Sequence, residues 1–281
     1  MFLKLMYITN NPQVALIAEK YGVDRIWIDL ETLGKEERQK NMDTVKSSHT
    51  IEDISQIKPI LSSAELLVRV NPWNAESPRE IEDVISAGAD MIMLPMWKDP
   101  ETVRKFVEQV NGRTKTTLLL ETKEAVECID SVLEGPIFDE IHIGLNDLHL
   151  SYGLDFMFEL LANGTVEMLC DKFKKKGIPY GFGGIAKIGD GLLPAEKIIM
   201  EHYRLGSTRA ILSRTFCDNA IIESVSEIDR VFKENMRELN SFVVELEKYE
   251  DEIFEDNKET VKVIVKEISN NIKEKKKKCI L

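Results

Sequence analysis

The sequence has few cysteines, few basic residues for its acid content and no long apolar run. Its 4 cysteines lie far apart without a C-x-x-C pair, which argues against a zinc knuckle or a disulfide framework. No apolar run approaches the roughly 18 residues of a membrane-spanning helix. With 37 Lys+Arg against 49 Asp+Glu the net charge is −12, so we expect neither nucleic acid nor a membrane as a partner.

The remaining composition is that of an ordinary globular protein. Hydrophobic residues make up 43% and charged residues 31% of the 281 positions, and this length suits one large α/β domain. The opening residues, MFLKLMYITNNP, lack the charged region, apolar stretch and cleavage site of a secretory signal. We therefore expect a cytoplasmic protein.

Short aliphatic runs alternate with longer amphipathic stretches, which is typical of successive βα units. The predicted strands span residues 3–8, 25–30, 65–70, 90–95, 116–121, 140–145, 179–183 and 210–213. Eight such runs favour a closed (β/α)8 TIM barrel over an open sheet. Helix starts are predicted where Asn11, Ser77 and Asp99 precede proline, and Ser77 with Glu80 has capping-box spacing. Helix ends are predicted at Gly22, Gly88, Gly112, Gly177 and Gly206.

The barrel is predicted for residues 1–217. Beyond it, the pattern of apolar residues changes. Residues 218–249 are predicted to form the eighth helix and its extension, because apolar residues recur every three or four positions. The recurring residues are Ile221, Val225, Ile228, Phe232, Met236 and Leu239. We expect this stripe to be exposed and to support a homo-oligomer. Residues 250–281 are predicted to be a charged tail, either frayed in solvent or with its lysines paired to the acidic cluster at 250–256.

In a parallel βα barrel the active site lies at the carboxyl ends of the strands. Glu121 and Asp147 follow adjacent predicted strands, and two such carboxylates suit Mg²⁺ or Mn²⁺, although either acid could instead cap a helix. Arg69 is embedded among apolar neighbours in its predicted strand and is a candidate to bind a substrate carboxylate or an enolate oxygen. No predicted strand carries a lysine near its carboxyl end, which disfavours a Schiff-base mechanism.

Several of these motifs resemble one known family. The segments IDLE, LLVRVNP, SAGADMIMLPM, LLLETKEA and IHIGLNDLHL are similar to the HpcH/HpaI aldolase and citrate lyase β-subunit superfamily, over about residues 20–216. The resemblance implies a metal-dependent (β/α)8 enzyme that makes or breaks carbon–carbon bonds through a pyruvate- or acetyl-type enolate. It also implies that Glu121 and Asp147 are metal ligands and that Arg69 binds substrate and stabilises the enolate.

The sequence also departs from the pattern of the pyruvate aldolases in this family. Thr32 stands where they carry a histidine that takes part in proton transfer, so the general base is unassigned. His49, with Glu31 behind it, is the candidate substitute. The further candidate substrate-binding residues are Asp29, Asn146, Gly183, Gly184 and Arg214, although Arg214 is equally able to pair with Glu31.

The sequence therefore predicts a divalent-metal-dependent carbon–carbon lyase or aldolase. Its expected substrates are a small anionic 2-oxo acid and an aldehyde or acyl partner. Two alternatives stay open: a lyase of the citryl- or malyl-CoA type, and a barrel without activity that serves as a binding or scaffold subunit.

Overall fold

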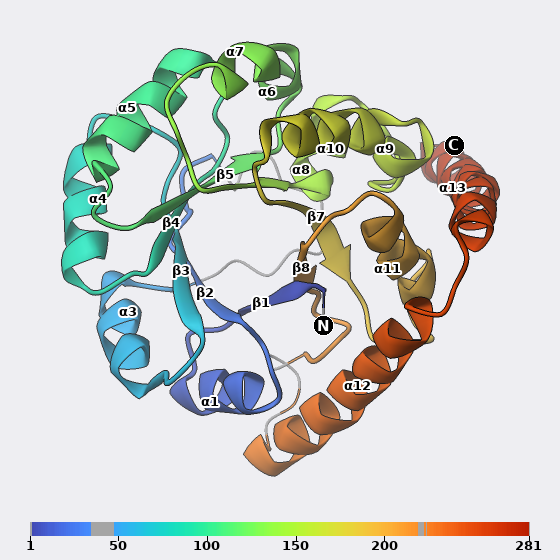
Figure 1. Cartoon of the computed structure of the whole chain (residues 1–281), viewed down its shortest axis with the longest axis horizontal. Helices are drawn as coiled ribbons and strands as arrows, with labels where there is room; N and C mark the ends of the chain where they lie inside the picture. The colour runs from blue at the N-terminus through green and yellow to red at the C-terminus, as the bar shows by residue number, and fades with distance from the viewer. Residues whose placement is uncertain (1, 35–47, 219–221, 223, 281) are drawn as a thin grey trace. The chain divides into compact units, whose positions relative to one another are not determined.

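A computed structural model describes the chain except residues 1, 35–47, 219–221, 223 and 281. Parallel strands follow one another in sequence order and close into a barrel, with helices along its outside (Figure 1). The strands are β1 (Lys4–Ile8), β2 (Arg25–Asp29), β3 (Glu65–Arg69), β4 (Met91–Leu94), β5 (Lys115–Leu120), β6 (Glu140–Ile143), β7 (Tyr180–Ile185) and β8 (Arg209–Leu212). The predicted (β/α)8 barrel is confirmed, and each strand lies within 2 residues of its predicted limits.

The helices begin largely where the sequence predicts. They are α1 (Pro12–Lys20), α3 (Ile51–Ile57), η1 (Lys58–Ile60), α4 (Ser77–Ser86), α5 (Pro100–Val110), α6 (Lys123–Glu127), α7 (Ile129–Leu133), α8 (Leu145–Ser151), α9 (Glu159–Ala162), α10 (Thr165–Lys176), α11 (Ala195–Arg204), α12 (Val225–Leu246) and α13 (Asp251–Ile280). Asn11 and Asp99 cap α1 and α5 through their side chains, as predicted. The predicted glycine stops all adopt positive φ.

The predicted cap of α4 is wrong by one residue. Ser77 is the first helical residue and Glu76 is the N-cap, so the capping box between Ser77 and Glu80 does not form. The Ser77 hydroxyl instead accepts from the backbone N–H of Asn74 at 2.8 Å. The Glu80 carboxylate bonds to Asn71, in the loop before the helix. Both side chains are thus used to shape the loop between β3 and α4.

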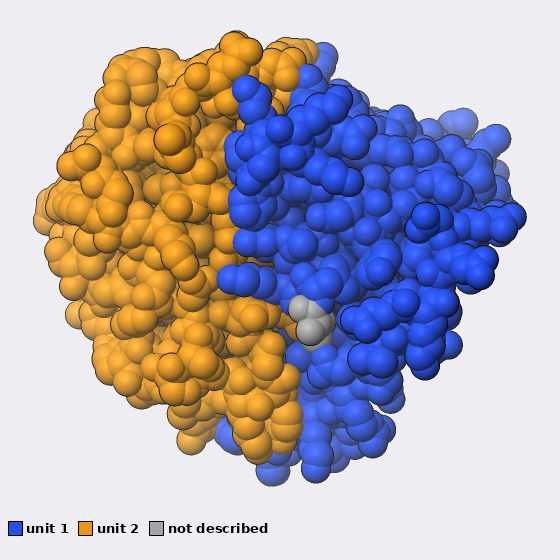
Figure 2. All heavy atoms as spheres, in the orientation of Figure 1, with its two compact units in different colours: residues 1–4, 121–123, 142–281 blue, residues 5–120, 124–141 orange. Residues whose placement is uncertain are grey.

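Two compact units can be distinguished, and Figure 2 colours them separately. Unit 1 comprises residues 1–4, 121–123 and 142–281, and unit 2 comprises residues 5–120 and 124–141. The expected boundaries after residues 217 and 249 stay predictions. No described helix is both long enough and apolar enough to cross a membrane.

The apolar stripe of the eighth helix is not the exposed surface that we expected. Ile228, Phe232, Met236 and Leu239 of α12 are all buried within this chain. Ile221 lies outside the described residues. The stripe therefore gives no support to a homo-oligomer, which stays a prediction.

The C-terminal segment is a long helix rather than a frayed end. Helix α13 contacts α11 and α9 (Figure 1). Its Asn257 side chain is buried and donates to Lys197 O at 3.0 Å and to Glu201 Oε1 at 2.9 Å. Lys276 Nζ pairs with Asp155 Oδ1 at 2.7 Å. Lysines 275–278 cannot reach the acidic cluster at 250–256. Both lie on one helix, and at about 1.5 Å of rise per residue they are nearly 30 Å apart.

A buried ion-pair network lies at the amino ends of several strands in unit 2. Arg25 is 1% exposed and donates to both oxygens of Glu140, at 2.6 and 2.8 Å. Its Nε also donates to Glu65 at 2.8 Å, and Glu65 accepts a further bond from Lys115. Burial alone lowers the pKa of Arg25, but the bonds and charge of Glu140 outweigh it and raise that pKa. In this barrel type the amino-terminal face serves stability.

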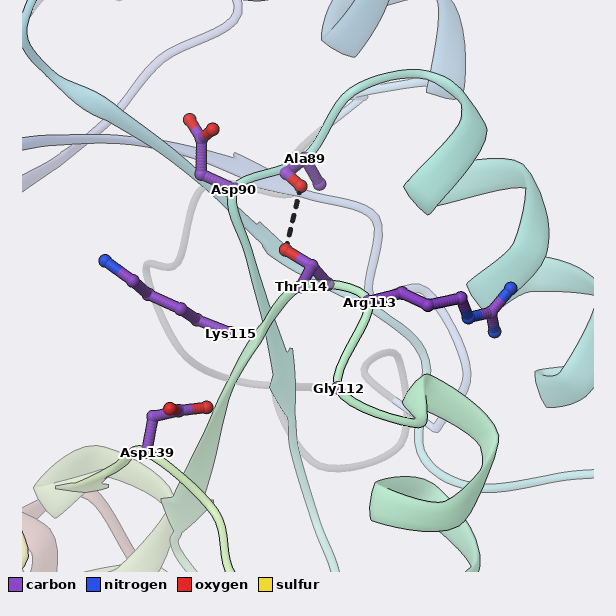
Figure 3. Close-up of a pocket in the computed structure, with 7 residues that line it drawn as sticks. All are labelled: Ala89, Asp90, Gly112, Arg113, Thr114, Lys115 and Asp139. Atoms are coloured by element: carbon purple, nitrogen blue, oxygen red, sulfur yellow. Dashed lines mark hydrogen bonds between the residues drawn. The ribbon is translucent and has the colours of Figure 1, made fainter.

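A hollow of about 430 Å³ lies at the amino ends of β4 and β5, and Figure 3 shows the residues that line it. It is lined by Ala89, Asp90, Gly112, Arg113, Thr114, Lys115 and Asp139. Asp90 pairs with Lys58 at 2.6 Å, and Arg113 pairs with Glu82 at 2.6 Å. Asp139 accepts from the Thr116 backbone at 2.7 Å. Because its charged side chains hold neighbouring elements together, we assign this hollow to the scaffold.

Candidate active site

Asp29 and Arg69 are the last residues of two neighbouring strands. They are register partners at the carboxyl ends of β2 and β3. Arg69 donates from Nε to Asp29 Oδ1 at 2.8 Å and from Nη2 to Asp29 Oδ2 at 2.9 Å. This bidentate contact fixes the plane of the guanidinium, and pairs of this kind are stronger than neutral hydrogen bonds.

A second carboxylate and an aromatic ring also contact Arg69. Its Nη1 lies 3.1 Å from Glu31 Oε2, and its guanidinium carbon lies 5.3 Å from the centre of the Trp27 ring. The side chains of Asp29 and Glu31 are each 2% exposed, and that of Arg69 is 12% exposed. One cation thus faces two buried anions. The sequence pointed to the three charged residues but not to Trp27. The contact of Trp27 with the guanidinium depends on how the Arg69 side chain lies across the neighbouring strand β2.

His49 lies against the backbone of Asp29. It is half-buried, immediately before the N-cap of α3, and its Nδ1 accepts from the Asp29 N–H at 3.0 Å. A nitrogen that accepts a hydrogen bond carries no proton, so the neutral ring bears its hydrogen on Nε2. In this tautomer His49 is a hydrogen-bond donor through Nε2. While the bond to Asp29 stands, Nδ1 is not available as a base.

Asn71, a residue that the sequence argument did not single out, links the loop after β2 to α4. Its Oδ1 accepts from the backbone N–H groups of Thr32 and Leu33, at 2.9 and 3.0 Å. Its own Nδ2 donates to Glu80 Oε1 at 2.7 Å. Thr32, at the position of the family's histidine, is therefore bonded to Asn71.

The two predicted metal ligands lie in unit 1. Glu121 follows the last residue of β5 directly, and it is 3% exposed. Asp147 lies in the first turn of α8, the helix that follows β6. Asn146 precedes it, and both residues are half-buried. Glu121 thus directly follows β5, whereas Asp147 lies four residues beyond the end of β6, on helix α8, and their role as metal ligands stays a prediction.

The glycines of β7 have a backbone role. Gly183 has φ +52°, and a Cβ there would lie 2.8 Å from Leu145 Cδ1. Its carbonyl accepts from His142 Nε2 at 3.2 Å. The pairing of β7 with β8 shifts register between Gly181 and Gly184. Glycine at 183 is therefore required by the local geometry, whether or not substrate approaches it.

The predicted anion-binding residue Arg214 follows β8 in a turn, and its side chain is exposed. Ser213 and Thr215 on either side of it share a hydroxyl–hydroxyl bond of 2.8 Å. Glu31, which the sequence allowed as a partner for Arg214, forms an ion pair with Arg69.

Comparison with known proteins identifies the family of this chain. The model for the HpcH/HpaI aldolase/citrate lyase family matches residues 3–157, more than half of the 281 residues. The chain belongs to the HpcH/HpaI aldolase/citrate lyase family. The family is of the aldolase and citrate lyase type and is typically dependent on a divalent metal. A comparison with curated proteins finds no match.

Solved structures of several proteins share the fold at low sequence identity. An HpcH/HpaI aldolase from Desulfitobacterium hafniense DCB-2 is 18% identical with a TM-score of 0.56, covering 75% of this chain and 86% of that one. An HpcH/HpaI aldolase/citrate lyase family protein from Burkholderia cenocepacia J2315 is 15% identical with a TM-score of 0.56, covering 81% and 95%. The citrate synthase SbnG is 18% identical with a TM-score of 0.57, covering 80% and 92%.

The donor chemistry of Glu121 and Asp147 suits the family's dependence on a divalent metal. In the described part of the chain, no three or more His, Cys, Asp or Glu side chains are grouped to hold a metal ion. Mg²⁺ does not need such a cage, since it usually keeps several waters and binds through one or two carboxylates together with its substrate. The pair therefore fits Mg²⁺ or Mn²⁺ better than a structural zinc ion, which takes four protein ligands.

Proposed function

We propose that this family member is a divalent-metal-dependent carbon–carbon lyase or aldolase that acts on a 2-oxo acid through its enolate. The observation that carries the proposal is Arg69 at the carboxyl end of β3, 12% exposed and with its orientation fixed by Asp29 and Glu31. A fixed guanidinium is suited to a small anion and to the negative charge that develops on an enolate oxygen.

The proposed cation is Mg²⁺ or Mn²⁺, with Glu121 and Asp147 as its protein ligands. When bound, such an ion supplies a Lewis acid that polarises the keto group and stabilises the enolate charge. Arg69 binds and orients the substrate carboxylate through N–H donors. Asn146, Gly183, Gly184 and Arg214 are proposed as further substrate contacts.

His49 is proposed to donate a hydrogen bond rather than to abstract a proton. In the direction of bond formation, the aldehyde oxygen becomes an alkoxide. The Nε2–H group of the tautomer described above is suited to stabilise that alkoxide by a hydrogen bond, and the alkoxide takes its proton from water. The complementary base is then a carboxylate, for which Glu31 is the candidate, or a water molecule.

Activity measurements on variants of the two carboxylates test the proposal. We expect the chain to cleave or form a carbon–carbon bond with pyruvate and a short aldehyde, to lose this activity with a chelator and to regain it with Mg²⁺ or Mn²⁺. Glu121→Gln and Asp147→Asn should each lower kcat at least about 100-fold without unfolding the barrel. Glu124→Gln, on the half-exposed side chain that pairs with Lys98, is the matched control and should keep full activity. Full activity in metal-free protein would disprove the proposal.

The same assays separate the alternatives. Tight binding of an acyl-CoA in calorimetry, with turnover of that thioester alone, would favour a lyase of the citryl- or malyl-CoA type. Failure to bind Mg²⁺ or Mn²⁺, together with no turnover of any 2-oxo acid, would favour a scaffold barrel. Light scattering tests the predicted homo-oligomer.

A further inference from the structure

The loop after β2 carries the residue that completes the charged cluster around Arg69. Glu31 lies two positions beyond the end of β2, and its carboxylate reaches Arg69 Nη1 at 3.1 Å. The residues that follow it, Thr32 and Leu33, are exposed. The backbone N–H of Glu31 donates to Asp29 Oδ1 at 3.2 Å, but the exposed residues that follow it need a restraint of their own.

Asn71 supplies that restraint. Its Oδ1 accepts from Thr32 N at 2.9 Å, from Leu33 N at 3.0 Å and from Thr32 Oγ1 at 3.3 Å. Three donors from two consecutive residues thus converge on one oxygen that is 39 and 38 residues away in sequence. Asn71 itself lies two residues beyond Arg69, so the bond joins the loop after β2 directly to the end of β3.

Glu80 fixes Asn71 in turn. Its carboxylate accepts from Asn71 Nδ2 at 2.7 Å and from Asn71 N at 3.2 Å. Burial raises the pKa of Glu80 above its ordinary value, and both bonds from Asn71 act against that rise. The amide side chain of Asn71 accepts through its oxygen and donates through its nitrogen. Aspartate at position 71 would place a second carboxylate against Glu80.

We propose that Asn71 and Glu80 are positioning residues that hold the loop after β2 so that Glu31 stays on Arg69. This inference rests on the proposed function, because it assigns the pair a role in orienting the guanidinium that binds substrate. Neither residue touches the reacting atoms in this account. They act through Thr32 and Leu33, whose N–H groups they fix.

Amide hydrogen exchange tests the restraint without relying on activity. In Asn71→Ala the exchange of Thr32 and Leu33, followed in a peptide over residues 30–34, should accelerate at least tenfold, while β2 and β3 keep their protection. Asn74→Ala is the matched control. It removes an asparagine from the same loop whose bonds go to Pro72 O and Glu76 N, and it should leave exchange at 30–34 unchanged.

Kinetics test the consequence for the reaction. Loss of alignment should lower kcat of Asn71→Ala and Glu80→Ala about 10- to 100-fold, with little change in KM or in Mn²⁺ affinity. Glu80→Gln keeps an acceptor for Asn71 and should recover most of kcat, which a general loss of stability would not explain. Unchanged exchange at 30–34 in Asn71→Ala overturns the restraint, and faster exchange with unchanged kcat overturns the positioning role. If the wild-type chain turns over no 2-oxo acid, the proposed function fails, but the exchange result still decides the restraint.

Discussion

Arg69 and Asp29 are the last residues of two paired strands, and they are partners both in strand register and through their side chains. The register that places Asp29 opposite Arg69 also brings the carboxylate and guanidinium into a bidentate contact of 2.8 and 2.9 Å. The Asp29 backbone serves the same site, because its N–H fixes the tautomer of His49. The end of β2 thus orients both the guanidinium of Arg69 and the imidazole of His49.

The first prediction concerns Arg69→Lys. A lysine keeps the charge but cannot bond Asp29 side-on while also reaching Glu31, so the enolate-binding geometry is lost. We expect kcat/KM to fall at least about 100-fold. Titration with oxalate, an enolate mimic, should show weaker binding in the presence of Mg²⁺. Comparable kinetics for lysine and arginine would mean that only the charge at this position matters.

The second prediction concerns the pair at the other end of β2. Glu140→Gln removes the charged partner that binds both Nη groups of the buried Arg25, and although Glu65 still bonds its Nε, we expect a cost of about 1.5–3 kcal/mol. The control is Arg104→Ala on α5, which removes contacts of 2.6 and 2.5 Å to Glu101 and Glu108, both exposed. Urea unfolding should show a change of at most about 0.5 kcal/mol for the control. Equal effects of the two variants would contradict the scaffold role assigned to Arg25.

The elements of this fold follow from local sequence patterns. Strand limits, the caps at Asn11 and Asp99 and the glycine stops depend on residues within one turn or one strand, so they were predictable. The same periodicity predicted that Glu121 and Asp147 follow consecutive strands, and the structure has Glu121 directly after β5 and Asp147 in the helix that follows β6.

The contacts within the candidate site were not predictable in the same way. The bond between Arg69 and Asp29 joins residues 40 apart, and those of Asn71 join residues nearly as distant. Such partners depend on strand register and loop conformation, which no local pattern specifies. The tautomer of His49 likewise depends on a backbone group 20 residues away.

The third prediction concerns acid stability. His202 is fully buried, stacks on Phe182 and accepts or donates at Nδ1 with Ser207 at 2.8 Å. Burial, together with the nearby His142, lowers the pKa of His202 to about 3. The unfolded chain therefore binds a proton that the folded chain does not, and stability is lost as pH falls from about 6.5 toward 3. At pH 5 this loss is about 2 kcal/mol.

Unfolding measured at pH 7 and pH 5 checks this expectation. A His202→Gln variant has no titrating group at this position, so its stability should fall less between the two values than that of the wild type. The lower starting stability of the variant does not affect the comparison, because only the change with pH is used. An identical loss in both proteins would show that other groups control the acid response.

The last prediction concerns helix α13. Removal of residues 250–281 would uncover Tyr203, which stacks on Phe254 at 4.7 Å, and would take Asn257 away from the buried Glu201. The buried side chains of Phe254, Val261 and Val265 would be lost as well. At about 1.5–3 kcal/mol for each buried apolar side chain, we expect the truncated chain to lose at least about 4 kcal/mol. Truncation after residue 274 removes the exposed lysines 275–278, with the surface pair of Lys276 and Asp155, together with residues 279–281, and it should leave the unfolding midpoint in urea nearly unchanged. If the longer truncation were equally harmless, α13 would be an appendage and not part of the folded core.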